Sequence, residues 1–161
     1  MRLRIVKAMS GAAVIAIALS AAPAQAGNDN DAVMAANAGF YAALNKMFVG
    51  EVAPMEAVWS HDDDVTYMGP DNNFDRGWAA VQKDWQRQAA AKLGGKVDAA
   101  DVHVIAGSDL AVVTDYEVGE NTNANGTTAQ VKLRATNIFR KEDGAWKMVG
   151  HHTDLLPYMN K

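Results

Sequence analysis

The amino-acid sequence predicts a single α+β domain in which three N-terminal helices pack on a mainly antiparallel sheet. Three observations carry this prediction. Between residues 31 and 49, apolar residues recur every three or four positions, as on one face of a helix. From Lys96 onward the apolar residues alternate instead, which is typical of strands. Asp143-Gly144 lies between two such alternating segments and supplies the positive φ that a tight hairpin needs.

Helices are expected at three places before residue 95. The first spans residues 31–49, and its apolar face comprises Val33, Ala36, Phe40, Leu44 and Met47. A second, short helix begins at Pro54, a residue that the first helical turn tolerates, and runs toward Trp59. The third covers about residues 78–93 and ends at Gly94-Gly95.

The sheet is expected to contain a short strand at residues 65–68 and longer strands after Lys96. One of these follows the turn at 107–109. Its more apolar face comprises Leu110, Val112, Thr114, Tyr116 and Val118, and we expect this face to meet the core. Asp115 and Glu117 then lie on the opposite face, and they are candidate pocket acids only if that face points inward instead.

The last hairpin gives the clearest candidate residues. A three-residue turn at 142–144 pairs Arg134 with His152 and Ala135 with His151. The apolar face then holds Leu133, Ala135, Asn137, Phe139, Val149, His151 and Leu155, and the other holds Lys132, Arg134, Thr136, Met148, His152 and Asp154. Asn137 and His151 are therefore predicted to face the helices, whereas Arg134, His152 and Asp154 form an outer polar cluster or a subunit contact.

The first 26 residues read as an export signal. They combine basic residues at the start, an apolar run of about a dozen residues that is short of a membrane span, and the cleavage pattern Ala24-Gln25-Ala26. We expect a mature domain of residues 27–161 in the periplasm or secreted, with an uncleaved N-terminal anchor as the alternative.

Charge and composition exclude several classes of function. Cleavage removes three basic residues and leaves 12 basic against 19 acidic residues, so the mature chain has a net charge of −7. This charge argues against nucleic acid and anionic membrane as partners. The absence of cysteine excludes thiol catalysis, disulfides and cysteine-based metal sites. His61 beside Asp62, Asp63 and Asp64 suggests a metal, but consecutive residues rarely converge on one ion, so we predict a solvated turn, no metal and no cofactor.

The order and spacing of several short segments resemble the SnoaL-like branch of the nuclear transport factor 2-like superfamily. The segments are Trp59-Ser60-His61, Asp64 to Tyr67, Gly77-Trp78, Arg134-Ala135-Thr136, Asp143-Gly144, Trp146 and Val149 to His152. The resemblance covers nearly all of residues 30–156. It implies a cone-shaped domain whose curved sheet and helices enclose a pocket, and whose outer sheet face often makes a homodimer.

The resemblance also provides a negative test. Ketosteroid isomerases of this fold carry a tyrosine at the position of Phe40 and a proton-abstracting aspartate at the position of Gly69, just before Pro70. Abstraction of a proton needs a base near the substrate and a donor for the developing enolate. Neither aligned residue provides these groups, so the steroid-isomerase mechanism is not expected.

Two main classes of function remain open, because one fold hosts many functions. The first is a module that binds a small organic molecule without changing it, and this is the class that we favour. The second is a cofactor-free cyclase, isomerase or dehydratase that uses His151 as acid or base. A dimeric association module is a third reading. The candidate ligand-binding residues are Trp59, Tyr67, Tyr116, Asn137 and His151, although aromatic residues in a domain of this size usually serve packing.

Overall fold

The computed structural model describes residues 26–122 and 125–154. The predicted signal peptide, apart from its last residue Ala26, and Leu155 therefore lie outside the described residues. Within the described residues, no helix is both long and apolar enough to cross a membrane.

The α+β class and the order of helices before the long strands are confirmed. The helices are α1 (Ala26–Met47), α2 (Ala53–Val58) and α3 (Trp78–Ala91). The strands are β1 (Thr66–Met68), β2 (Asp75–Arg76), β3 (Lys96–Ala106), β4 (Leu110–Thr122), β5 (Thr128–Glu142) and β6 (Ala145–Asp154). The short strand β2 was not predicted. Two residues are too few to show a periodicity, and β2 exists through its pairing with β1.

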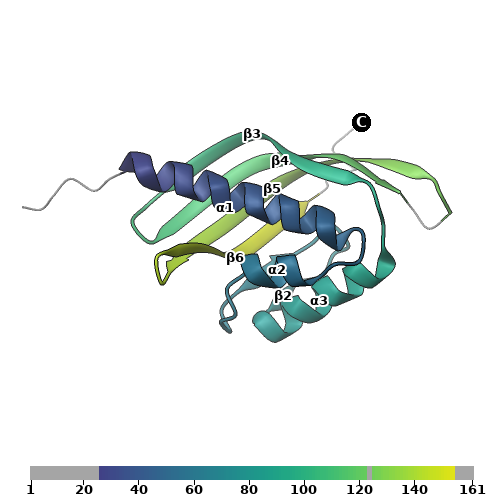
Figure 1. The fold of residues 1–161 in the computed structure, drawn as a ribbon, viewed down its shortest axis with the longest axis horizontal. Helices are drawn as coiled ribbons and strands as arrows, with labels where there is room; N and C mark the ends of the chain where they lie inside the picture. The colour runs from purple at the N-terminus through teal and green to yellow at the C-terminus, as the bar shows by residue number, and fades with distance from the viewer. Residues whose placement is uncertain (1–25, 123–124, 155–161) are drawn as a thin grey trace, which may run out of the picture.

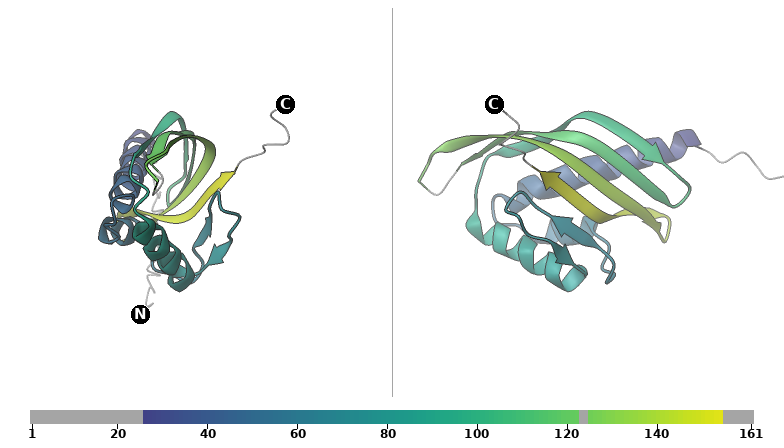
Figure 2. Two further views of the ribbon diagram at one scale, coloured as in Figure 1. Left: turned by 90° about the vertical axis from the view of Figure 1, so that its right-hand side faces the viewer. Right: turned by 180° about the vertical axis from the view of Figure 1, so that it is seen from behind.

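The six strands form one mixed sheet in the order β2-β1-β6-β5-β4-β3. All neighbouring strands are antiparallel except β1 and β6, which run parallel. Helix α1 lies across the long strands, with α2 and α3 beside its C-terminal half (Figure 1). The sheet is curved, with the helices on its concave side (Figure 2).

The core lies between the concave face of the sheet and the buried faces of the helices. Its largest fully buried side chains include Phe40, Trp59, Trp85, Phe139 and Met148. Each large buried apolar side chain contributes about 1.5–3 kcal/mol relative to its exposure to water. With no cysteine in the chain, this packing has no disulfide to support it.

The predicted register of the last hairpin is wrong by one residue beside the turn and by two residues beyond an irregularity in β6. Glu142 pairs with Ala145, so the turn consists of Asp143 and Gly144 alone, with φ values of 50° and 83°. Positive φ at both central residues is the geometry of a type I′ turn, which suits Asp-Gly. The shorter turn shifts the register by one residue and the irregularity in β6 by one more, so Arg134 pairs with Asp154 rather than with His152, and Asn137 pairs directly with His151.

An irregularity in β6 corrects a second expectation. The register shifts between the pairs Ile138–Gly150 and Phe139–Met148, which leaves Val149 as an extra residue. A bulge of this kind breaks the strict alternation of a strand. Met148 is therefore fully buried instead of lying on the outer face, and His151 also points inward.

The face assigned to β4 is wrong as well. Ala111, Val113, Asp115 and Glu117 are the buried set, whereas Leu110 and Tyr116 are 50% and 39% exposed. The more apolar face of this strand is the outer one. Two acids therefore lie inside the domain.

Candidate functional site

A cavity of about 380 Å³ opens between the concave sheet face and the helices. Its apolar walls include Leu44, Phe48, Trp85, Leu93, Val97 and Val131. Polar groups enter from different elements: Tyr67 from β1, Gln88 from α3, Glu117 from β4 and His151 from β6. An apolar cavity with a few convergent polar groups is the usual form of a small-molecule site.

Asp115 is the centre of a buried polar network behind this cavity. The Tyr41 hydroxyl donates to its Oδ1 over 2.7 Å, and the Asn37 amide donates to its Oδ2 over 3.0 Å. Burial raises the pKa of Asp115, while the bonds from Asn37 and Tyr41 oppose that rise. The pKa of Tyr41 is raised by burial and by the charges of Glu117 and Asp115, so Tyr41 remains a donor.

This network fixes the tautomer of His151. Because Asn37 turns its amide nitrogen to the Asp115 carboxylate, its oxygen accepts from Asn137 Nδ2, over 2.7 Å. Asn137 Nδ2 also lies 3.4 Å from Asp115 Oδ2, which leaves Asn137 Oδ1 facing His151 Nδ1 at 2.5 Å. An amide oxygen only accepts, so His151 Nδ1 carries the hydrogen and its Nε2 is an acceptor.

His151 and Glu117 face each other at the cavity. His151 Nε2 lies 3.5 Å from Glu117 Oε1, and both side chains are more than nine-tenths buried. Among the residues that the structure describes, Glu117 Oε1 has no hydrogen-bond partner. Burial first, and then the charge of Asp115, raises the pKa of Glu117 to about 7, while burial lowers the pKa of His151 to about 3. In slightly acidic solution the pair therefore holds one proton, on Glu117, beside a neutral imidazole.

Aromatic rings hold the imidazole of His151 in place. The ring of Tyr67 is parallel to it, with an interplanar angle of 8° and centroids 5.7 Å apart. The ring of Phe40 lies on another side, at 4.8 Å. Packing on two sides limits rotation of the imidazole and keeps Nε2 directed at Glu117.

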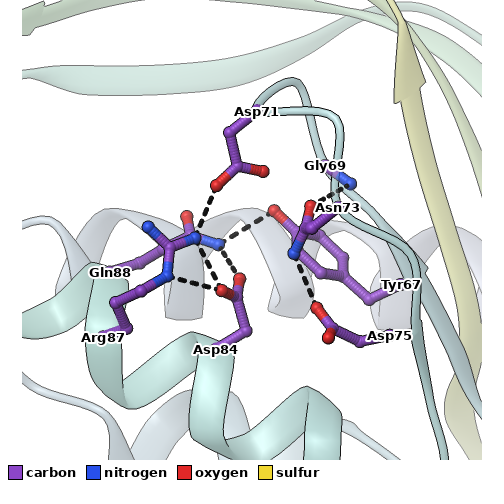
Figure 3. Close-up of polar contacts among 8 residues, drawn as sticks. All are labelled: Tyr67, Gly69, Asp71, Asn73, Asp75, Asp84, Arg87 and Gln88. Atoms are coloured by element: carbon purple, nitrogen blue, oxygen red, sulfur yellow. Dashed lines mark hydrogen bonds and ion pairs between the residues drawn. The ribbon is translucent and has the colours of Figure 1, made fainter.

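Polar contacts at α3 fix Tyr67 in turn (Figure 3). Gln88 Nε2 donates to the Tyr67 hydroxyl over 2.9 Å and to Asp84 Oδ2 over 2.6 Å. Arg87 joins Asp84 to Asp71 of the turn between β1 and β2. This turn, which carries Pro70 at the cavity, is thereby tied to α3.

The packing of Tyr67 disfavours any side chain at Gly69, the position where the ketosteroid isomerases carry their aspartate. A Cβ at this position would collide with the hydroxyl of Tyr67. Tyr67 therefore occupies the space that a side chain at position 69 would need. Phe40, at the position where the ketosteroid isomerases carry a tyrosine, is fully buried in the core. The acid that lines the cavity, Glu117, comes from β4 instead.

The structure brings together some of the predicted ligand-binding residues and separates others. Tyr67 and His151 line the cavity, and Asn137 lies directly behind His151. Trp59 is buried against Trp85, with ring centroids 5.9 Å apart, and belongs to the core. Tyr116 lies on the outer face, where the Lys132 ammonium is 5.9 Å from its ring centroid, so its predicted inward position is wrong.

The predicted outer cluster has the expected exposure. Arg134, His152 and Asp154 are all exposed, and Arg134 pairs with Asp154 across the two strands. Its role in a subunit contact stays a prediction.

The acidic turn near His61 is held by the guanidinium group of Arg140, which forms ion pairs with Asp62 and Asp64. Among residues 26–122 and 125–154, no group of three side chains is arranged to hold a metal ion.

The sequence contained no indication of Asn37 and Tyr41, and it led us to place Asp115 and Glu117 on the outer face. One signal for the two acids was available: they follow Ala111 and Val113 at alternating positions, on the face with the smaller residues. Small residues on a strand face leave room for a helix to approach closely.

The chain is similar to known proteins over most of its length. A family model described as a SnoaL-like domain matches residues 33–158. A candidate calcium/calmodulin-dependent protein kinase type II association domain from Thiobacillus denitrificans is 31% identical, with a TM-score of 0.65 over 76% of this chain and 94% of that one. Among curated proteins, none is similar to the chain in sequence.

Two further solved structures share the fold. A candidate dehydratase of the nuclear transport factor 2-like family from Streptomyces avermitilis is 24% identical, with a TM-score of 0.72 over 81% of this chain and 98% of that one. A nuclear transport factor 2-like superfamily protein from Salmonella enterica is 12% identical, with a TM-score of 0.71 over 80% of this chain and 91% of that one. At these identities the likeness is one of fold alone.

Proposed function

The chain belongs to the SnoaL-like domain family, and we propose that its cavity binds a small organic molecule and moves a proton to or from it. The observation that carries the proposal is the buried pair of Glu117 Oε1 and His151 Nε2 at the cavity, 3.5 Å apart. An acid whose pKa is near neutral, beside a neutral imidazole, suits general acid–base catalysis.

The two groups have complementary roles. Ionised Glu117 can accept a proton from a carbon or hydroxyl of the bound molecule, and protonated Glu117 can return it to another position. His151 Nε2, kept as an acceptor by Asn137, can accept a hydrogen bond from the bound molecule in the same step and so orient it. Such shuttling supports an isomerisation or the elimination of water, and it requires side chains alone. This geometry favours the enzyme over the purely binding module.

The proposal is tested with 5-nitrobenzisoxazole, an apolar compound that opens after loss of a single proton. We expect saturable turnover that rises with pH through about 7, as Glu117 ionises, and that falls roughly 100-fold in Glu117→Gln. Glu120→Gln is the matched control, because Glu120 is an exposed acid on the same strand. Equal turnover in both variants would contradict the proposal.

A second candidate function is association of two copies through the outer sheet face. Support comes from the name of the Thiobacillus denitrificans protein, an association domain, and from the exposed Tyr116, Arg134 and His152 on this face. Light scattering at micromolar concentration should give a dimer mass, and the mass should fall toward that of a monomer in His152→Glu. A monomer mass for the unchanged protein would end this idea.

We also propose export, because residues 1–26 have the pattern of a cleaved signal. The mature protein should begin at Gly27 and be found in the periplasm or the medium. N-terminal sequencing of the purified protein measures this directly, and recovery of the full-length chain in the membrane pellet would contradict it.

A further inference from the structure

The charges around the cavity are unbalanced toward the acidic side. Glu117 lines the cavity and Asp115 lies behind it, both buried. Among the described lining residues, Lys132 is the one cationic side chain, and its ammonium lies near the Tyr116 ring on the outer face. Arg87, near the cavity, is more than half exposed and is already paired with Asp84 and Asp71. A carboxylate ligand would therefore meet like charge without a compensating cation.

The hydrogen-bonding groups of the cavity also favour a cationic ligand over an anionic one. His151 Nε2 is an acceptor, because its Nδ1 hydrogen is directed to Asn137. Ionised Glu117 is also an acceptor, and its Oε1 has no hydrogen-bond partner within the described part of the chain. Two acceptors that face each other at 3.5 Å need a donor between them. A protonated amine brings three N–H donors and serves both, whereas a hydroxyl brings one and a carboxylate none.

The walls of the cavity suit the rest of such a molecule. Tyr67 and Trp85 present aromatic rings, with centroids 4.4 Å apart. Aromatic faces attract a cation and also pack against an apolar body. On these observations we propose that the site takes a small organic amine, with its ammonium group between Glu117 and His151. The proposal deepens the proposed function and rests on it, because it names the class of molecule that this cavity binds.

Binding of an amine should be coupled to the release of a proton. Glu117 faces Tyr41 of α1, Tyr67 of β1, Asp115 of its own strand and His151 of β6, none of them a cation near neutral pH. Without a bound donor, Glu117 is protonated below about pH 7. An ammonium in contact with it stabilises the ionised carboxylate, so binding in slightly acidic solution must release a proton.

Three probes of similar size separate the possible ligand classes on the unchanged protein: 2-phenylethylamine, 2-phenylethanol and phenylacetate. Isothermal titration calorimetry near pH 6 should show the amine binding about tenfold more tightly than the alcohol. Phenylacetate should bind more weakly than either. Repeating the titration in buffers with different ionisation enthalpies should show release of roughly one proton with the amine and none with the alcohol.

Two variants test whether Glu117 is the group that selects the amine. Glu117→Gln should lose the preference for the amine and the proton release while keeping the affinity for the alcohol, and Glu120→Gln should keep all three. Phenylacetate binding as tightly as the amine, no binding of the amine at millimolar concentration, or an unchanged preference in Glu117→Gln would each overturn the inference. The comparison of the three probes needs no variant, so it decides the matter even when Glu117→Gln fails to fold. If the unchanged protein shows no preference for the amine but still turns over 5-nitrobenzisoxazole, this inference fails and the proposed function stands.

Discussion

Replacing Glu117 with glutamine should change how the stability of the fold depends on pH. Glu117 is 5% exposed, and burial raises the pKa of its carboxyl from 4.5 to about 7. Glutamine has nearly the same shape and is neutral at every pH. The substitution therefore removes the ionisation of this side chain and leaves the packing against the cavity almost unchanged.

The sign follows from which state holds the proton more tightly. The folded protein binds the Glu117 proton more tightly than the unfolded chain does, so the resulting stabilisation is complete below pH 4.5. It is lost as the pH rises from 4.5 to about 7, because the folded state must then bury a charge. A shift of this size corresponds to about 3 kcal/mol in total, of which about 2.5 kcal/mol falls between pH 5 and pH 8.

His151 has the opposite effect, and the comparison cancels it. Its pKa is lowered to about 3, so the fold loses stability as the pH falls from 6.5 toward that value. This loss occurs in both proteins. The difference between wild type and Glu117→Gln therefore isolates the carboxyl group.

Urea unfolding followed by tryptophan fluorescence measures the effect. From about pH 5 to about pH 8, wild type should lose about 2.5 kcal/mol of stability relative to Glu117→Gln, with equal slopes in urea. Parallel pH profiles for the two proteins would refute the reasoning, because they would mean that Glu117 titrates alike in the folded and unfolded states.

Two further substitutions test the support of the site. Gly69→Ala should cost about 1–3 kcal/mol and shift the near-ultraviolet signal, because the new methyl group collides with Tyr67; an unchanged melting curve would contradict this. Asn37→Ala should cost a similar 1–3 kcal/mol by leaving buried partners unpaired, and ¹⁵N spectra should show His151 as a mixture of tautomers. Asn45→Ala is the matched control on the same helix, because Asn45 bonds only the backbone of Val97, so it should keep the single tautomer.

Local patterns were enough for the class of fold and for part of the site. The spacing of apolar residues located α1 and α3 to within a few residues, because one buried helical face repeats over several turns. Alternation in β5 placed Asn137 inward correctly, since the buried face there is also the apolar one. The hairpin turn was found at Asp143-Gly144, although its length was misjudged by one residue.

The remaining errors have a common physical origin. Counting apolar residues assumed that the more apolar face of β4 is buried, yet Leu110 and Tyr116 lie on the outer face of the sheet. The acids on the inner face are tolerated because Asn37 and Tyr41 of α1, more than 70 positions away in sequence, donate to Asp115. Contacts between residues so far apart do not show in local periodicity. The extra residue Val149 in β6 likewise reflects the register with β5 and has no local signal.

The same long-range contacts make His151 different from an ordinary buried histidine. A buried imidazole satisfied on both nitrogens would be a structural residue, and burial alone would keep it neutral. Here Asp115, which accepts a hydrogen bond on each oxygen, orients Asn37, Asn37 orients Asn137, and Asn137 takes the Nδ1 hydrogen, so the second nitrogen is left as an acceptor toward the cavity. Three hydrogen bonds thus link Asp115 on β4 to the imidazole of His151 on β6. The fold uses α1 to keep one acceptor of His151 directed at Glu117, which is the condition for sharing a proton between them.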